Sequence, residues 1–345
     1  MKRCGILLLT IIFLTYGYKG YKVYDDYIND VVKVKESGVL SDISNNVMPV
    51  NLKGLHIEDI QQIRKVQKDG NNIFLLNGDK LLHFDINGNF LNYIASDISD
   101  SKESFIASYT IDSDNHHIIV IDGSRNICKY NYNGKLISKL KITHPWNKLT
   151  AFTYHKGHLW ATAEITEKHD DNTLWVVNNL CKLDMDMNEI SRERLQPAEK
   201  GRVILYESLH AHELLVDGQD VYAYKAPVDM KYLLDDTLNI LFRNSMPMML
   251  LRRDYHEKAS LYPVRKSKHF MISTFYNTQD DHYTFCYDKS NNTAYMLQKG
   301  FKDDFYNTGY IANLQPVDNN NSTYCYVKTN SSDEKTVLYL VTLKS

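Results

Sequence analysis

The sequence has few of the motifs that common enzyme classes need. It contains five cysteines in 345 residues and no C-x-x-C pair, so zinc-ribbon and thioredoxin-type sites are not predicted. It also has no Gly-x-Ser-x-Gly elbow for a hydrolase nucleophile and no His-Glu-x-x-His zinc motif. Its net charge is only −2, so it lacks the basic surface that nucleic-acid binding would require. These absences leave a globular protein without a recognisable catalytic motif and without a nucleic-acid partner.

The N-terminus has the features of an export signal. Lys2 and Arg3 precede a short apolar run at residues 5–16, which is too short to span a membrane comfortably. No Ala-x-Ala-like cleavage site follows, and Cys4 precedes the run, so lipid anchoring is not supported. We therefore expect residues 1–20 to be a signal peptide or an uncleaved N-terminal anchor. The protein is expected to be exported to the periplasm or cell surface and to contact the membrane only through this segment, if it is uncleaved.

The remaining sequence contains a stretch that occurs twice. Ile118 follows Ile73 by 45 residues, and Gly134 follows Gly88 by 46, with similar residues between the two pairs. Each copy has short apolar runs joined by polar turns, and the chain's 25 tyrosines suit half-buried strands. Each copy also has an Asn-Gly turn, which is typical of a hairpin whose two central residues both take positive φ. Four short strands per repeat of about 45 residues are typical of a propeller blade.

Later repeats are less regular but keep this order of elements. An insertion is expected around residues 167–172, and residues 228–249 are apolar and irregular. We therefore predict an all-β fold, a six-bladed β-propeller of four-stranded antiparallel blades, over residues 48–345. Residues 21–47 are expected to form a leader segment. A strand from one terminus is expected to complete the blade formed by the other, which closes the ring and removes the sheet edges.

The runs at residues 69–91, 114–137 and 285–304 resemble the NHL-like six-bladed β-propeller family of exported Bacteroides-group proteins. Most members of that family have no assigned activity, so the resemblance implies a fold rather than a function. The sequence lacks the cysteine after the apolar run that many members carry for lipid attachment.

Several polar clusters are candidates for metal-binding sites. Asp184-x-Asp186-x-Asn188 has the spacing that opens a calcium loop, but Glu189 stands at the required glycine, so an acidic hairpin turn is the preferred interpretation. His210 and His212 could begin a metal site if the segment is extended, but no third ligand is identifiable.

Three further clusters have simpler explanations. His116 and His117 are interpreted as residues that fill the polar turn of a blade, where Asn71 and Asn72 stand in the first copy. Asp303-Asp304 could be paired carboxylates for acid–base work, but adjacent residues usually point apart. Arg252-Arg253-Asp254 is interpreted as a solvated turn. We therefore predict no catalytic residue, no metal ligand and no cofactor.

The remaining cysteines, Cys128, Cys181, Cys286 and Cys325, lie in apolar or aromatic contexts, which favours buried free thiols over disulfides. The favoured function is an exported binding or scaffold module for a protein or glycan partner at the cell envelope. One alternative is a metal-dependent propeller hydrolase or lyase with its site at the central channel, and another is a purely structural envelope component. A local function is expected where later repeats break the pattern, at residues 163–175, 196–213 and 226–258.

Overall fold

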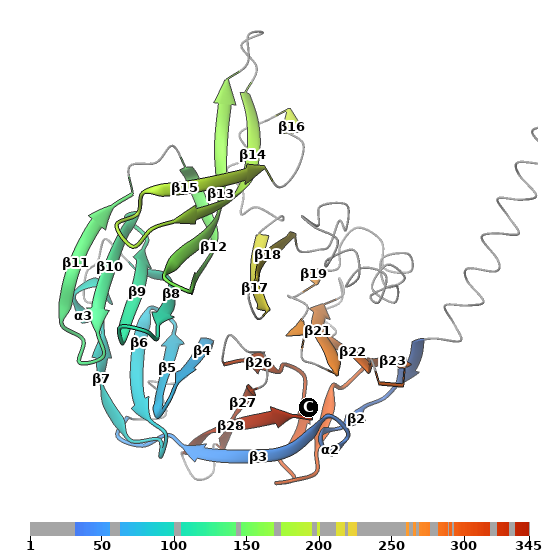
Figure 1. The fold of residues 1–345 in the computed structure, drawn as a ribbon. Helices are drawn as coiled ribbons and strands as arrows, with labels where there is room; N and C mark the ends of the chain where they lie inside the picture. The colour runs from blue at the N-terminus through green and yellow to red at the C-terminus, as the bar shows by residue number, and fades with distance from the viewer. Residues whose placement is uncertain are drawn as a thin grey trace, which may run out of the picture.

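The computed structural model consists almost entirely of β-strands arranged around a ring (Figure 1). It describes residues 32–55, 63–99, 105–142, 146–168, 174–194, 199–200, 212–217, 220–225, 260–261, 265–266, 269–276, 282–288, 290–291, 293–317, 323–330 and 335–344. The helices within these ranges are two single turns, α2 (Leu40–Ile43) and α3 (Ser96–Ser99). None of the helices in the described ranges is long and apolar enough to cross a membrane. The expected signal or anchor at residues 1–20 lies outside these ranges.

The first two blades are regular four-stranded antiparallel sheets. Their strands are β4 (Ile63–Asp69), β5 (Asn72–Asn77), β6 (Lys80–Asp85) and β7 (Phe90–Ile94), then β8 (Ile106–Asp112), β9 (His117–Asp122), β10 (Asn126–Asn131) and β11 (Leu136–Lys141). Consecutive strands pair in both sheets. Figure 1 shows β4 and β8 towards the middle of the ring and β7 and β11 at its outer rim.

The third blade contains a hairpin that is longer than its counterparts. Its strands are β12 (Trp146–His155), β13 (His158–Lys168), β14 (Leu174–Leu183) and β15 (Glu189–Arg194), and β16 (Glu199–Lys200) pairs with β14. Pairing between β13 and β14 continues to Lys168 and Leu174. The insertion expected around residues 167–172 lies at the far end of this lengthened hairpin, where residues 167 and 168 are paired and 169–172 lie outside the described ranges. Figure 1 shows the hairpin extending away from the ring.

The fourth and fifth blades are described in part. The fourth contributes β17 (His212–Asp217) and β18 (Asp220–Lys225), and the irregular segment expected at 228–249 lies outside the described residues. The fifth contains β19 (Ser260–Leu261), β20 (Arg265–Lys266), β21 (Phe270–Tyr276), β22 (His282–Asp288) and β23 (Thr293–Leu297). The strand β1 (Val32–Lys35) pairs with β23 in parallel.

The sixth blade joins the two ends of the described chain. It consists of β26 (Gln315–Pro316), β27 (Thr323–Asn330), β28 (Lys335–Leu343) and the N-terminal β3 (Ser44–Asn51). Because β3 pairs antiparallel with β28, the predicted closure by a terminal strand is confirmed. A small sheet precedes this blade, in which β2 (Gly38–Val39) pairs with β24 (Phe301–Asp303) and β24 with β25 (Gly309–Ile311). Part of the segment expected to be a leader therefore belongs to the sheets.

The core lies between neighbouring blades. Successive side chains of a strand point to opposite faces of its sheet, so each blade buries two apolar faces. In β9, Ile118 and Val120 pack against the first blade, whereas Ile119 and Ile121 pack against the third. The four cysteines Cys128, Cys181, Cys286 and Cys325 are buried and free, which confirms the prediction of buried thiols. Burial raises the pKa of these thiols, that of Cys181 to about 11.

Candidate functional site

One hairpin turn recurs between the last two strands of the first three blades. It starts at Asp85, Asn131 and Asp184. In each case the side-chain oxygen accepts the backbone N–H of the residues two and four positions later, at 2.8 to 3.1 Å. The side-chain amides of Asn89 and Asn188 also donate to Asp85 and Asp184, which lowers the pKa of both carboxyls.

The backbone of this turn differs from the sequence prediction. Of the Asn-Gly pairs, only the glycines take positive φ, +81° at Gly88 and +77° at Gly134. The expectation that Asn87 and Asn133 would do so as well is therefore wrong. The physical reason is the side-chain cap, which holds the earlier residues in an ordinary turn and leaves one left-handed position before the return strand.

The glycine of the turn lies against the outer strand of the preceding blade. A Cβ atom on Gly88 would lie 2.0 Å from the carbonyl oxygen of Asn51 in β3. A Cβ atom on Gly134 would lie 2.5 Å from that of Tyr93 in β7. Real Cβ atoms essentially never approach so closely. Glycine is therefore needed at these positions for the close contact as well as for the left-handed backbone.

In the third blade, Met187 occupies the position of these glycines. Its φ is +70°, and its backbone N–H donates to Asp184 as Gly88 donates to Asp85. Its side chain is buried in the core shared by the second and third blades, where Ile142 also packs. Because Met187 carries a Cβ, its turn cannot approach β11 as closely as the other two turns approach β3 and β7.

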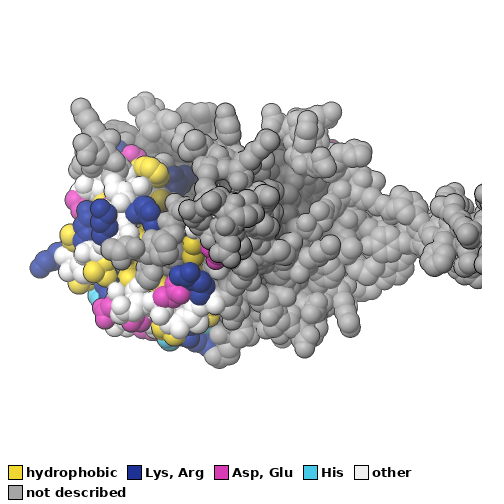
Figure 2. All heavy atoms as spheres, turned by 90° about the horizontal axis from the view of Figure 1, so that it is seen from above, with side chains coloured by type: hydrophobic (Ala, Val, Ile, Leu, Met, Phe, Trp, Pro, Cys, Tyr) yellow, Lys and Arg dark blue, Asp and Glu magenta, His cyan; other side chains and the backbone are white. Residues whose placement is uncertain are grey.

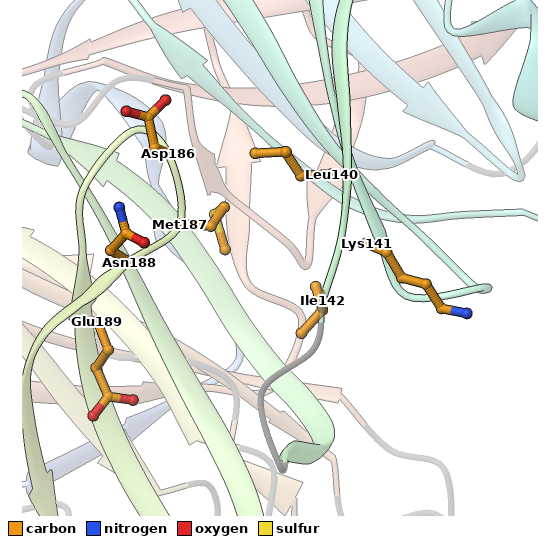
Figure 3. Close-up of a pocket in the computed structure, with 7 residues that line it drawn as sticks. All are labelled: Leu140, Lys141, Ile142, Asp186, Met187, Asn188 and Glu189. Atoms are coloured by element: carbon orange, nitrogen blue, oxygen red, sulfur yellow. The ribbon is translucent and has the colours of Figure 1, made fainter.

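A cavity of about 360 Å³ lies between this turn and the end of β11. Its lining consists of Leu140, Lys141, Ile142, Asp186, Met187, Asn188 and Glu189. Figure 3 shows Leu140, Ile142 and Met187 projecting into the space between the two segments, whereas Lys141 points away from it. The apolar wall of the cavity is therefore contributed by two different blades.

The outer strand β11 has no buried residue, unlike its counterparts β3 and β7. Leu136, Ile137 and Leu140 are 40%, 50% and 39% exposed, and Ile190 on β15 is 52% exposed. β11 is also the edge of its sheet. Figure 2 shows hydrophobic side chains interspersed with Lys, Arg, Asp and Glu side chains on the described part of the face seen from above. The unpaired backbone groups of an edge strand can pair with another chain. Exposed apolar side chains beside them mark a surface that a partner can cover.

The polar side chains around the cavity are held in place. Both carboxylate oxygens of Glu189 accept hydrogen bonds from Arg192, at 3.0 and 2.7 Å, which raises the pKa of the guanidinium. The Asn188 amide donates to Asp184 at 2.8 Å. Asp186 is exposed at the mouth. The cavity therefore combines an apolar wall with a fixed polar rim, as small ligand pockets commonly do.

The structure places the predicted calcium motif in this same turn. Asp184 accepts hydrogen bonds on both carboxylate oxygens from its own hairpin. The acidic-hairpin interpretation is therefore confirmed. Within the described residues, no group of three His, Cys, Asp or Glu side chains is placed to hold a metal ion.

The histidine clusters lie apart from the cavity. His116 ends the turn between β8 and β9, and its Nδ1 lies 3.6 Å from Asp69. His117 is the first residue of β9, and its Nδ1 lies 3.8 Å from the buried Asp112. The turn-filling interpretation therefore holds for His116 and is wrong for His117, which is a paired strand residue. His212 begins β17. His210 and the Arg252–Asp254 segment lie outside the described residues.

The adjacent carboxylates Asp303 and Asp304 serve different parts of the fold. Asp303 is buried and accepts hydrogen bonds from Tyr306 and Thr308 in its own loop, whereas Asp304 accepts one from the backbone of Ser41. Burial acts to raise the pKa of Asp303, but these hydrogen bonds outweigh it and lower the pKa. The two carboxylates do not form an acid–base pair.

The cavity falls outside the segments in which a local function was expected. Residues 226–258, most of 196–213 and residues 169–173 lie outside the described ranges, and the described residues 163–168 and 174–175 belong to the long hairpin. Sequence reasoning found the turn at Asp184 but assessed it only for calcium. The available signal was Met187, which replaces the glycine found at positions 88 and 134.

Comparison with known proteins places this geometry in a family. A crystal structure of a candidate exported protein from Bacteroides fragilis matches with a TM-score of 0.57 at 12% identity, covering 91% of this chain and 99% of that one. The β-propeller domain of Cps50 (Swd1) from Myceliophteria thermophila matches with a TM-score of 0.40 at 9% identity, covering 84% and 99%. No curated protein matches the sequence. The DUF5128 family, described as a 6-bladed beta-propeller, matches residues 24–225, more than half of the chain. The predicted six-bladed fold is thus confirmed, and the chain belongs to this family of six-bladed β-propellers.

Proposed function

We propose that this protein is an exported binding module that holds a protein partner at its outer rim, where the second and third blades meet. The observation that carries the proposal is the cavity of about 360 Å³ beside an uncovered edge strand. Its volume is at the lower end of the range of roughly 300–1,000 Å³ that is typical of ligand pockets. The apolar walls suit a buried side chain of a partner, and β11 offers backbone groups next to it.

Three considerations favour a protein over a glycan at this position. The cavity wall is aliphatic and sulfur-containing, from Leu140, Ile142 and Met187, and none of the described residues that line it is aromatic. Aromatic faces are the usual stacking surfaces of binding sites. The exposed Ile190 on β15 adds apolar surface outside the lining of the cavity, which an aliphatic side chain would cover.

Export is supported by two separate observations. Lys2 and Arg3 precede a short apolar run with the layout of an export signal. The Bacteroides fragilis protein with a similar fold is itself named as a candidate for export. A partner would accordingly be a protein of the cell envelope or its surroundings.

A peptide selection tests the proposed function. A phage library of random linear peptides is panned on the immobilised protein, and enriched peptides are synthesised and titrated by fluorescence anisotropy. The titration uses the wild type, a Leu140→Glu variant and a Leu91→Glu variant. Leu91 is 49% exposed on the outer strand of the first blade, so it is a matched surface control away from the cavity.

The expected result is that enriched peptides bind the wild type and the Leu91→Glu variant alike and lose at least about tenfold in affinity for the Leu140→Glu variant. The carboxylate of the Leu140→Glu variant would lose its water against an apolar side chain of the peptide and gain no charged partner, which accounts for that loss. The proposal is wrong if no peptide is enriched or if the two variants behave alike. A glycan that binds with an affinity unaffected by Leu140→Glu would assign the partner to the other class.

A further inference from the structure

The outer strand β11 has an open edge. It pairs with β10 on one side, and the sheet order ends with it. The neighbouring outer strand β7 is half-buried, and the turn of the second blade contacts it at Tyr93. In the third blade Met187 takes the position of the glycine in that turn, a cavity lies between its turn and the end of β11, and no strand among the described residues pairs with the outer edge of β11. An unpaired edge of this kind can accept an added strand.

The register of β11 assigns its side chains to two unlike faces. Leu140 lies opposite Ile127, which packs in the core shared with the third blade. Lys139 lies opposite Cys128, which packs in the core shared with the first blade. Because side chains alternate along a strand, Leu140 faces the cavity and Lys139 and Lys141 face the opposite side. Figure 3 shows Lys141 pointing away from the cavity, as this alternation requires.

The side chains of Lys139 and Lys141 are both exposed. No carboxylate in the described part of the chain forms an ion pair with Lys139 or Lys141. The cavity face has the opposite character, because Leu140 and Ile142 present apolar surface there. At its end near the cavity, β11 therefore presents Leu140 towards the third blade and Lys139 and Lys141 towards the first, whereas Leu136, opposite Tyr130, adds an apolar side chain to the first-blade face further along the strand.

We infer that the partner presents an extended segment in which apolar and acidic side chains alternate, and that this segment pairs with the free edge of β11 as an additional strand. This inference rests on the proposed function and names the chemistry of its partner. Alternate apolar side chains of the segment occupy the cavity beside Leu140. The intervening carboxylates lie beside Lys139 and Lys141, where opposite charges on neighbouring strands attract.

The pattern follows from the period of a strand. An added strand places every second residue on the same face as Leu140 and the rest on the face of the lysines. A helix has a period of 3.6 residues and cannot match both faces of β11 at once. Main-chain hydrogen bonds supply affinity in such strand addition, and the alternating side chains supply specificity.

Three fluorescein-labelled, capped heptapeptides serve as probes in anisotropy titrations. In the first, Leu and Glu alternate. In the second, Leu and Lys alternate, and the third has the composition of the first with its Leu residues grouped together. The proteins are the wild type, the Lys139→Glu/Lys141→Glu double variant and the Leu91→Glu control.

The wild type and the Leu91→Glu control are expected to bind the Leu–Glu peptide about tenfold tighter than either other peptide. Each cross-strand charge pair changes affinity by a factor of about 1.5 to 5, and two pairs are involved. The double variant should reverse the preference and bind the Leu–Lys peptide best. The grouped peptide should bind weakly to every form of the protein, because it cannot keep its apolar residues on one face.

N-methylation identifies the strand addition itself. Methyl groups are placed on alternate backbone nitrogens of the Leu–Glu peptide, in two versions that block opposite edges. One version should lose binding and the other should keep it, because only one edge of an added strand faces β11. Equal loss or equal retention in the two versions would show that the segment does not pair with an edge.

The outcomes separate this inference from the function on which it rests. If panned peptides bind at Leu140 but the Leu–Glu peptide shows no preference over Leu–Lys, the inference is wrong and the proposed function stands. If the Leu–Glu peptide does not bind at protein concentrations up to about 1 mM while the panned peptides still bind, the inference is likewise wrong and the proposed function stands. If no peptide binding depends on Leu140, both are wrong.

Discussion

Replacement of Gly134 by alanine tests how the blades make contact. The left-handed backbone at this position makes alanine less favourable than glycine in the folded state by about 1–2 kcal/mol. Alanine also lowers the conformational entropy of the unfolded chain, which offsets about 0.4–1 kcal/mol of that loss of stability. The new Cβ would also lie 2.5 Å from the carbonyl oxygen of Tyr93, which is backbone and cannot swing aside. Overpacking of this kind adds about 1–3 kcal/mol. The control is Gly157→Ala, where φ is +75° rather than +77° and a Cβ would meet nothing within 4 Å.

The two variants should differ by about 1–3 kcal/mol in the free energy of unfolding, because the backbone strain is common to both and only Gly134→Ala meets the neighbouring blade. Equilibrium urea denaturation followed by circular dichroism measures this difference. Gly88→Ala extends the series, since its Cβ would lie 2.0 Å from the backbone of Asn51 at the ring closure, and its loss should be at least as large. Equal losses in Gly134→Ala and Gly157→Ala would show that the glycine is needed for its φ alone, and the explanation of the cavity would then fail.

Three other predictions concern the cavity, a buried histidine and the thiols. Met187→Gly should let its turn approach β11 and abolish peptide binding. It should also lower the free energy of unfolding by up to about 4 kcal/mol in urea titrations, because the lost core side chain costs about 2–5 kcal/mol and the released backbone strain returns about 1–2 kcal/mol. The pKa of His83 is lowered chiefly by burial, so the unfolded chain takes up its proton first as the pH falls. The free energy of unfolding should therefore be highest above about pH 6.5 and fall below it, and His83→Gln should flatten this slope in urea titrations repeated across that range. In a Cys4→Ser variant, the four buried thiols should react with an aromatic disulfide reagent only after unfolding, and rapid native labelling would contradict their burial and raised pKa.

The architecture was predictable because its signals are local. Apolar alternation, the capped turn at Asp85 and its copy at Asn131 each lie within a few residues, and the spacing of the copies sets the size of a blade. The cavity was not predictable in this way. It depends on the distance between Met187 and Leu140, which are separated in the chain by the strands β12, β13 and β14 and meet only when two blades pack. The pairing of β1 with β23 was missed for the same reason, since it joins residues at opposite ends of the chain.

The third copy of the turn keeps its cap and loses its glycine, and this combination bears on function. Asp184 makes the same hydrogen bonds as Asp85, so the turn itself is preserved. Met187 nevertheless adopts a left-handed backbone that glycine would tolerate at no steric cost, and such strain amounts to about 1–3 kcal/mol. A strained residue persists where the surrounding structure uses it, and Met187 is the residue that separates its turn from β11 and walls the cavity. Strain, cavity and exposed edge therefore meet at a single position. A defect in packing alone would account for the cavity but not for the retained cap that holds Met187 in place.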